Sequence, residues 1–290
     1  KDKHSGFKYD MEWHHAIAKE TAENCAVLLK NNGALPLSKN QKIAFIGEFA
    51  DKPRIQGGGS SHINCHKIDS ALNSAKQFAD VTYAKGYNTD NDITDEALLN
   101  EAVNAAKNAD IAVIFAGLPD AFENEGFDRK HIDMPKCQNE LIEEICNVQK
   151  NVVVVLHNGS SITMPWLDKV NAVLEMYLAG EASGAAAVNL LFGVANPSGK
   201  LAESFPFRIE DTPAYLNFPG NRDKVNYNEG IFIGYRYYDK KEMDILFPFG
   251  YGLSYTKFRY DNMKINGKSA SENDFSFKDN DNVTVSVDIT

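Results

Sequence analysis

The sequence is poor in cysteine and has no long apolar run. Four cysteines occur in 290 residues and none forms a C-x-x-C pair, so neither a disulfide framework nor a four-thiolate zinc site is indicated. Apolar runs such as Val152–Leu156 and Ala185–Val188 are far shorter than the roughly 20 residues that a membrane-spanning helix needs. We therefore predict no membrane span. We also predict four buried thiols, at Cys25, Cys65, Cys137 and Cys146.

Basic residues are also scarce. The 30 Lys and Arg residues are outnumbered by 40 Asp and Glu residues, which gives a net charge of −10. Nucleic acids and anionic membrane surfaces are recognised by clustered basic residues, so we expect neither as a partner. The hydrophobic share of 43% and the charged share of 24% are typical of a soluble globular protein and exclude a disordered chain.

The usual nucleotide and metal motifs are missing. The loop Gly57–Ser61 lacks the last glycine of the dinucleotide fingerprint because position 62 is His, and Gly193–Lys200 is one residue too long for a P-loop. No G-x-S-x-G or H-E-x-x-H occurs, and His62 and His66 lie beside the glycine loop without carboxylates at ligand spacing. We expect no cofactor and no metal. The glycine loop is either a flexible turn or a loop whose bare backbone approaches a ligand.

Short apolar strands alternate with amphipathic helices over the first 200 residues. This pattern predicts an α/β fold in which a mainly parallel sheet lies between helices in three layers. The expected strands are Lys42–Gly47, Val81–Ala84, Ile111–Ala116, Val152–Leu156 and Ala172–Tyr177. The expected helices are Trp13–Leu29, Ile68–Phe78, one capped by Thr94 that runs to Asn108, Gln138–Gln149 and Glu181–Phe192.

Ligands of parallel sheets bind beyond the carboxyl ends of the strands, where the strand-to-helix loops gather. The loops Glu48–Lys67, Gly117–Lys136 and His157–Trp166 are therefore the candidate site.

The composition of the sequence changes after Pro197. Aromatic residues, glycine and proline crowd together and helical periodicity disappears, which predicts irregular packing along the flank of the sheet. From Phe258 the pattern is that of strands, at Phe258–Ile265 and Val283–Thr290. Two strands cannot bury a core of their own. We therefore predict one domain over residues 1–257 and an incomplete β-domain over residues 258–290, in a chain that is a piece of a longer protein.

One loop carries candidate catalytic groups. Residues 123–129 hold three carboxylates and one arginine directly after a buried strand. This is either a solvated acidic loop or a site in which Phe122 and Phe127 anchor the loop to apolar surface. A glutamate beside apolar surface and other carboxylates has a raised pKa, which suits a general acid that protonates a leaving oxygen. Arg129 would orient its neighbours or bind a hydroxyl group.

Several long motifs together resemble the second, α/β-sandwich domain of family 3 glycoside hydrolases of the β-glucosidase type. The motifs are His14–Asn31 with Leu35-Pro36-Leu37, Glu123–Arg129, Asn196–Leu201, Tyr227–Ile231 with Gly234–Asp239, and Pro248–Thr256. The tail after Phe258 is similar to the start of a fibronectin type III-like domain.

The resemblance implies a division of labour between two domains. A (β/α)8 barrel supplies the nucleophilic aspartate and most sugar contacts, and this domain lends the acid/base glutamate, which by its place in the motif is Glu125. Glu123 is the competing assignment. The resemblance also places Glu123, the pair Asp128 and Arg129, and the loop residues Gly59, Ser60 and Ser61 near the substrate.

The function implied is that of part of a retaining β-glucosidase that removes β-D-glucosyl groups from the non-reducing ends of β-glucosides or oligosaccharides without a cofactor. The barrel is missing from the sequence, so we expect the chain alone to be inactive, and its uncovered face to favour a homodimer. The alternatives are a β-xylosidase of the same family and a non-catalytic carbohydrate-binding or scaffold module. A β-N-acetylglucosaminidase is disfavoured, since those relatives take their acid/base group from a barrel loop.

Overall fold

The computed structural model describes residues 8–271 and 273–290. The chain divides into two compact units, one that ends at Leu253 and one that begins at Ser254. The larger unit contains a six-stranded sheet with the order β1-β6-β5-β4-β2-β3, in which every pair is parallel except β1 with β6. Its strands are β1 (Val27–Asn31), β2 (Ile43–Ile46), β3 (Val81–Ala84), β4 (Ile111–Gly117), β5 (Val152–His157) and β6 (Ala172–Glu175).

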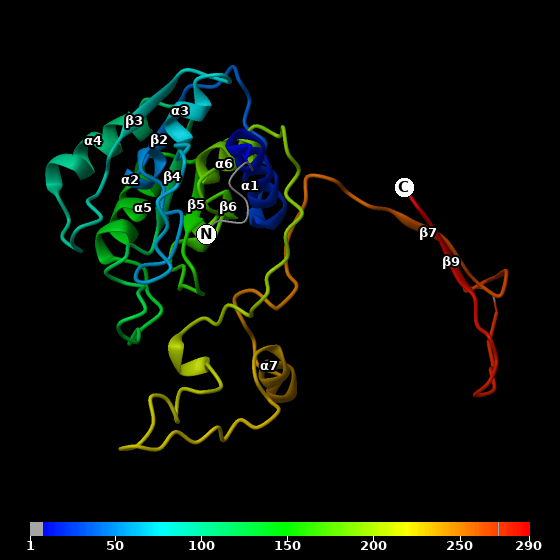
Figure 1. Ribbon diagram of the computed structural model, residues 1–290. Helices are drawn as coiled ribbons and strands as arrows, with labels where there is room; N and C mark the ends of the chain where they lie inside the picture. Colours follow the sequence, from blue (N-terminus) through cyan, green and yellow to red (C-terminus); the bar gives the residue numbers. More distant parts are fainter. Residues whose placement is uncertain (1–7, 272) are drawn as a thin grey trace. The chain divides into compact units, whose positions relative to one another are not determined.

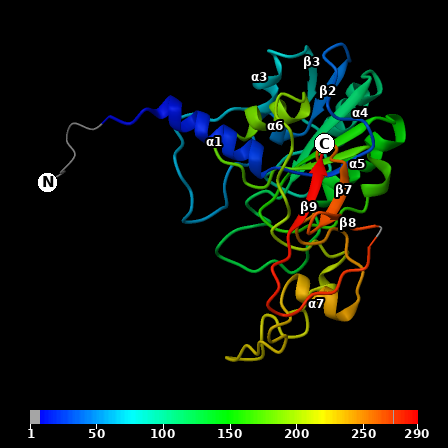
Figure 2. The ribbon, with the colours of Figure 1, turned by 90° about the vertical axis from the view of Figure 1, so that its right-hand side faces the viewer.

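Helices cover both faces of this sheet. Figure 1 shows α4 and α5 on one side of the strands and α1 and α6 on the other, and Figure 2 again shows α1 beside α6. Helix α3 also packs on α6. The helices are α1 (Met11–Cys25), α2 (Glu48–Asp51), α3 (Ala71–Ala75), α4 (Glu96–Lys107), α5 (Lys136–Val148) and α6 (Ser183–Leu191). The predicted α/β fold, a mainly parallel sheet between helices, is confirmed.

The middle of the sheet forms the core and fixes where the candidate loops begin. Every residue of β4 and β5 is buried, as the continuous apolar runs predict. Gly117 ends β4 opposite His157 at the end of β5, with φ of +146°. A Cβ at this position would lie 2.1 Å from the His157 carbonyl oxygen, so only glycine allows the approach. The loops after β4 and β5 therefore leave the sheet side by side.

Three predicted element boundaries are wrong. The helix expected over Trp13–Leu29 ends at Cys25, because Val27 to Asn31 pair with β6 as the antiparallel edge strand. The helix expected over Ile68–Phe78 is only the short α3, capped by Ser70. Asp95, not Thr94, caps α4 by accepting from the backbone N–H groups of Ala97 and Leu98, while the Thr94 hydroxyl donates to Glu140.

The aromatic segment after Pro197 is less buried and more regular than predicted. It contains the helix α7 (Tyr235–Lys241) and the short 3-10 helix η2 (Ile209–Asp211); η1 (Leu167–Lys169) precedes β6. Phe205, Tyr238 and Phe247 are buried. The exposed side chains include Phe207, Tyr215, Leu216, Phe218, Tyr227, Ile231 and Tyr235. This segment therefore presents much of its apolar surface outward instead of packing along the sheet.

The smaller unit is a three-stranded antiparallel sheet with the order β8-β7-β9. Its strands are β7 (Tyr260–Ile265), β8 (Lys268–Ser269) and β9 (Val285–Ile289), and all residues of β9 are exposed. The two predicted strands are thus present, with β8 in addition. The domain boundary after residue 257 stays a prediction.

Two further sequence predictions concern thiols and membranes. All four cysteines are free, but only Cys137 is buried; Cys25 is exposed, and Cys65 and Cys146 are half-buried. The prediction of four buried thiols is therefore wrong for three of them, which lie where their elements border solvent. Within the described ranges, no helix has the length and apolar character of a membrane span.

Candidate active site

Three loops meet at the carboxyl ends of the central strands, as the sequence predicts. Gly58, in the loop after α2, forms a β-bridge with Asn124 in the loop after β4. The latter loop also receives hydrogen bonds from Gly159 and Ser160, in the loop after β5. Residues from positions about 100 apart in the sequence thus surround the segment Glu123–Glu125.

The Glu125 side chain is exposed and rests on the glycine loop. Its carboxylate accepts hydrogen bonds from the Ser60 hydroxyl at 2.5 Å and from the Ser61 backbone N–H at 3.2 Å. Gly59 has φ of +97°, and a Cβ added there would lie 3.1 Å from three carbons of the Glu125 side chain. The absence of a side chain at Gly59 therefore gives Glu125 its place. Of the predicted group Gly59, Ser60 and Ser61, the two serines bind the Glu125 carboxylate and Gly59 leaves room for its side chain.

The raised pKa expected for a glutamate of this loop is wrong for Glu125. The hydrogen bonds from Ser60 and Ser61 hold the pKa of the Glu125 carboxyl below its ordinary value. The expected apolar anchoring is also only partial, because Phe127 is 51% exposed and Phe122 is half-buried against His131. With water on one side and hydroxyl and amide donors on the other, the ionised form of Glu125 is favoured.

Glu123 lies two residues away but points inward. One carboxylate oxygen accepts from Arg54 Nη1 at 2.7 Å and from the Gly159 N–H at 2.8 Å, and the other accepts from the Ser160 hydroxyl at 2.6 Å. Burial by itself raises the pKa of the Glu123 carboxyl, but the Ser160, Gly159 and Arg54 hydrogen bonds outweigh it and leave the pKa below its ordinary value. Both oxygens of Glu123 are therefore occupied by partners within the domain.

Asp128 and Arg129 face a neighbouring cavity. They line a hollow of about 570 Å³ together with Phe127, Tyr215 and Phe218. Arg129 Nη1 donates to the Ser160 hydroxyl at 2.8 Å, whereas its Nε and Nη2 atoms are buried with no hydrogen-bond partner in the described structure. Burial lowers the pKa of Arg129. Arg129 thus contacts the group that supports Glu123, in line with an orienting role.

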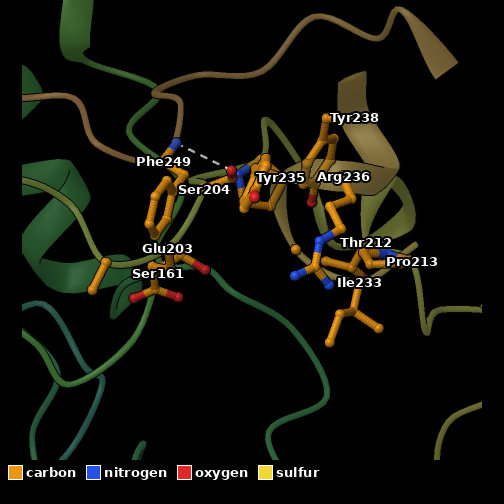
Figure 3. Close-up of a pocket in the computed structure, with 13 residues that line it drawn as sticks. Ser161, Glu203, Ser204, Thr212, Pro213, Ile233, Tyr235, Arg236, Tyr238 and Phe249 are labelled. Carbon is orange, nitrogen blue, oxygen red and sulfur yellow. Dashed lines mark hydrogen bonds between the residues drawn. The ribbon is translucent and has the colours of Figure 1, made fainter. Parts of the chain in front are cut away.

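Sequence reasoning missed a second cavity, of about 410 Å³, which Ser161 of the loop after β5 lines together with residues of the segment after Pro197. Figure 3 shows Ser161, Glu203 and Phe249 toward one end and Arg236, Thr212 and Ile233 toward the other. Burial raises the pKa of the Glu203 carboxyl. Nothing in the sequence marks Glu203, which follows the Asn196–Leu201 motif without a recognisable spacing to the acidic loop.

Two buried ionisable side chains near the site were also missed. Arg54, whose side chain is 4% exposed, binds Glu123, and Glu175 lies fully buried at the end of β6. Burial raises the pKa of Glu175 to about 8. Arg54 stands only three positions before the glycine loop. A sequence alone, however, gives no sign that an arginine there is buried.

The fold defines this chain as an α/β domain with an acidic loop at the carboxyl ends of its central strands, and the comparisons identify the family. Residues 26–255 match the glycosyl hydrolase family 3 C-terminal domain, so the chain belongs to that family. It is 51% identical over 277 residues to thermostable beta-glucosidase B of Acetivibrio thermocellus, covering 94% of this chain and 37% of that protein.

Other relatives are similar over a comparable part of the chain. The exo-alpha-(1->6)-L-arabinopyranosidase of Bifidobacterium longum is 46% identical over 264 residues, covering 87% of this chain and 35% of that protein. The crystal structure of the Bifidobacterium adolescentis beta-glucosidase superposes with a TM-score of 0.86 at 44% identity, covering 90% of this chain and 39% of that chain. The chain therefore spans well under half the length of these relatives.

Proposed function

We propose that Glu125 is the acid/base residue of a retaining β-glucosidase and that this domain acts within a longer polypeptide. The observation that carries the proposal is the contrast between two glutamates on one loop. Glu125 is exposed, and among the described residues its carboxylate is held along the glycine loop alone, so a substrate oxygen can approach it. Glu123 has both oxygens engaged by internal donors and is a poor proton carrier.

The proposed reaction is a double displacement. A carboxylate of the barrel domain attacks the anomeric carbon while Glu125 protonates the departing glycosidic oxygen. Glu125 then removes a proton from the water that releases the sugar. This route needs two carboxyl groups about 5 Å apart, and the second one would come from the barrel. The chain by itself is therefore expected not to hydrolyse glycosides.

The pKa of Glu125 bears on the acid step. In this chain the Ser60 hydrogen bond lowers that pKa and so favours the ionised carboxylate, which is the form that the second step starts from, whereas the first step needs the protonated form. Cover by a second domain and a sugar would remove water from the carboxyl and raise its pKa. We infer that the acid form becomes available only when the remainder of the enzyme and the substrate are in place.

The relatives are the evidence for which sugar the enzyme removes. The relatives include both beta-glucosidases and an arabinopyranosidase at similar identity, so overall identity does not separate the two substrates. A glucoside is favoured by the similarity to thermostable beta-glucosidase B. The exposed apolar side chains around Tyr215, Phe218 and Tyr227 offer a surface for the barrel or for a second copy of the chain.

The test uses the longer polypeptide that carries this domain, with aryl and alkyl β-glucosides as substrates. Glu125→Gln should lower kcat/KM on an alkyl glucoside by about 10²- to 10⁴-fold and much less on a dinitrophenyl glucoside, whose leaving group departs without a proton. Glu144→Gln, an exposed position on α5, is the matched control. An equal effect on both substrates would contradict the acid role, and glycosidase activity of this chain alone, removed by Glu125→Gln, would contradict the need for a barrel.

A further inference from the structure

Arg54 and the residues around Glu123 form a compact group, which we call the Glu123 cluster: Arg54, Glu123, Gly159 and Ser160. We propose that the residues of this cluster are positioning residues, which fix the position and orientation of the Glu125 carboxyl relative to the substrate. The proposal rests on the acid/base assignment of Glu125. It assigns a role to residues that themselves touch neither the leaving oxygen nor the reacting carbon.

Arg54 holds the loop after β4 at several points. Its Nη1 atom donates to the Leu118 carbonyl at 2.6 Å and to the Glu123 carboxylate, and its Nη2 atom donates to the Glu123 carbonyl at 3.0 Å. Its Nε atom donates to Asp120 at 3.3 Å. One buried side chain thus fixes both the beginning of the loop and the residue two positions before Glu125.

The loop after β5 holds Glu123 from the other side. The Gly159 N–H and the Ser160 hydroxyl bind the Glu123 carboxylate from the loop after β5. That loop is itself fixed, because Asn158 Nδ2 donates to the Ser160 carbonyl at 3.0 Å and to the buried Glu175 at 2.9 Å. A Cβ at Gly159 would lie 3.0 Å from both carboxylate oxygens of Glu123, so its backbone fits closely against that group.

The Glu123 cluster is also connected to Glu125 through the glycine loop. Arg54 lies three residues before this loop, in which Gly58 forms a β-bridge with Asn124 and the Ser60 hydroxyl binds Glu125. The same arginine is therefore connected to Glu125 along both segments that hold it. A displaced Glu123 would tilt Asn124 and Glu125 together, and displacements of about 1 Å can cost about 100-fold in rate.

A purely structural role is the competing explanation, and it makes a different kinetic prediction. General structural damage lowers activity on all substrates alike. Misplacement of a proton donor chiefly slows the step that needs the proton, so the loss in kcat/KM grows with the pKa of the leaving group.

The experiment measures kcat/KM over a series of aryl and alkyl β-glucosides in the longer polypeptide, for Arg54→Lys, Glu123→Gln and the milder Ser160→Ala, with Glu144→Gln as the control. We expect the first two variants to lose about 10- to 100-fold on alkyl glucosides and only a few-fold on dinitrophenyl glucoside. Ser160→Ala should show the same trend with a smaller loss. Unchanged substrate selectivity in all three variants would overturn the proposal.

Glu125→Gln is measured in the same series and separates the two proposals. If it steepens the dependence on the leaving group but the cluster variants do not, the acid role stands and the positioning role fails. If Glu125→Gln itself leaves the dependence unchanged, the proposed function fails. Amide hydrogen exchange over residues 121–128 of the present chain gives an independent readout, and we expect faster exchange in Arg54→Lys than in the unmodified protein. Unchanged exchange would contradict the clamp.

Discussion

The stability of this chain should depend on Glu123 and hardly at all on Glu125. The change to make is Glu123→Ala, which removes the nearer of the two carboxylates that the buried Arg54 guanidinium contacts and leaves the exposed Asp120, 3.3 Å from Nε, as the other. Removing one partner of a buried ion pair costs about 3–5 kcal/mol. Arg54 keeps Asp120 and the carbonyl oxygens of Leu118 and residue 123 as acceptors, so we place the loss near the lower limit.

A loss of about 3 kcal/mol in a unit of this size corresponds to a fall in Tm of roughly 6–12 °C. The assay is thermal and urea unfolding of this chain at pH 7, with Glu125→Ala as the matched variant. Glu125 is exposed, so its removal should leave Tm close to that of the unmodified protein.

The difference in Tm between Glu123→Ala and Glu125→Ala should also depend on pH. The folded-state pKa of Glu123 lies below its ordinary value of 4.5. Its stabilising contribution is therefore fully present above pH 4.5 and is lost as the pH falls through the folded-state pKa. Equal Tm values for Glu123→Ala and Glu125→Ala at pH 7 would refute the inference that Glu123 stabilises the fold and that the exposed Glu125 does not.

Two further predictions concern other carboxyl groups. Burial raises the pKa of Glu175 to about 8, so the stability of the chain should decrease as the pH rises from 4.5 toward 8. Glu175→Gln should remove this slope and stabilise the chain by on the order of 3 kcal/mol at pH 7, measured by urea unfolding across that range; a slope that persists in the variant would contradict it. Because the Ser60 hydroxyl lowers the pKa of Glu125, Ser60→Ala should raise that pKa toward 4.5 in an NMR titration of the carboxyl carbon, whereas an unchanged value would exclude this cause.

The layered fold could be predicted because its signals are local. Runs such as Val152–Leu156 are apolar on both faces and bounded by polar turns, which is the pattern of a strand buried between helices. The errors occur where tertiary pairing outweighs local pattern. Val27 to Leu29 continue the apolar spacing of α1, yet they belong to an edge strand because β6 offers them a partner.

The candidate site could be predicted in part. The motif around Glu125 and the glycine loop have recognisable sequences, and the structure brings them together through Ser60 and Ser61. The difference between Glu123 and Glu125 could not be seen, because it arises from which side of the loop meets Arg54 and Ser160. Those residues are distant in the sequence and belong to no motif.

The proton-carrying role of Glu125 is tested most directly by chemical rescue in the longer polypeptide. In Glu125→Ala, azide needs no general base and can attack the glycosyl-enzyme intermediate in place of water. The account predicts that azide restores turnover of dinitrophenyl β-glucoside in Glu125→Ala and yields the β-glycosyl azide, whereas Glu123→Ala is not rescued. Rescue of Glu123→Ala, with none for Glu125→Ala, would show that the roles of the two glutamates are reversed.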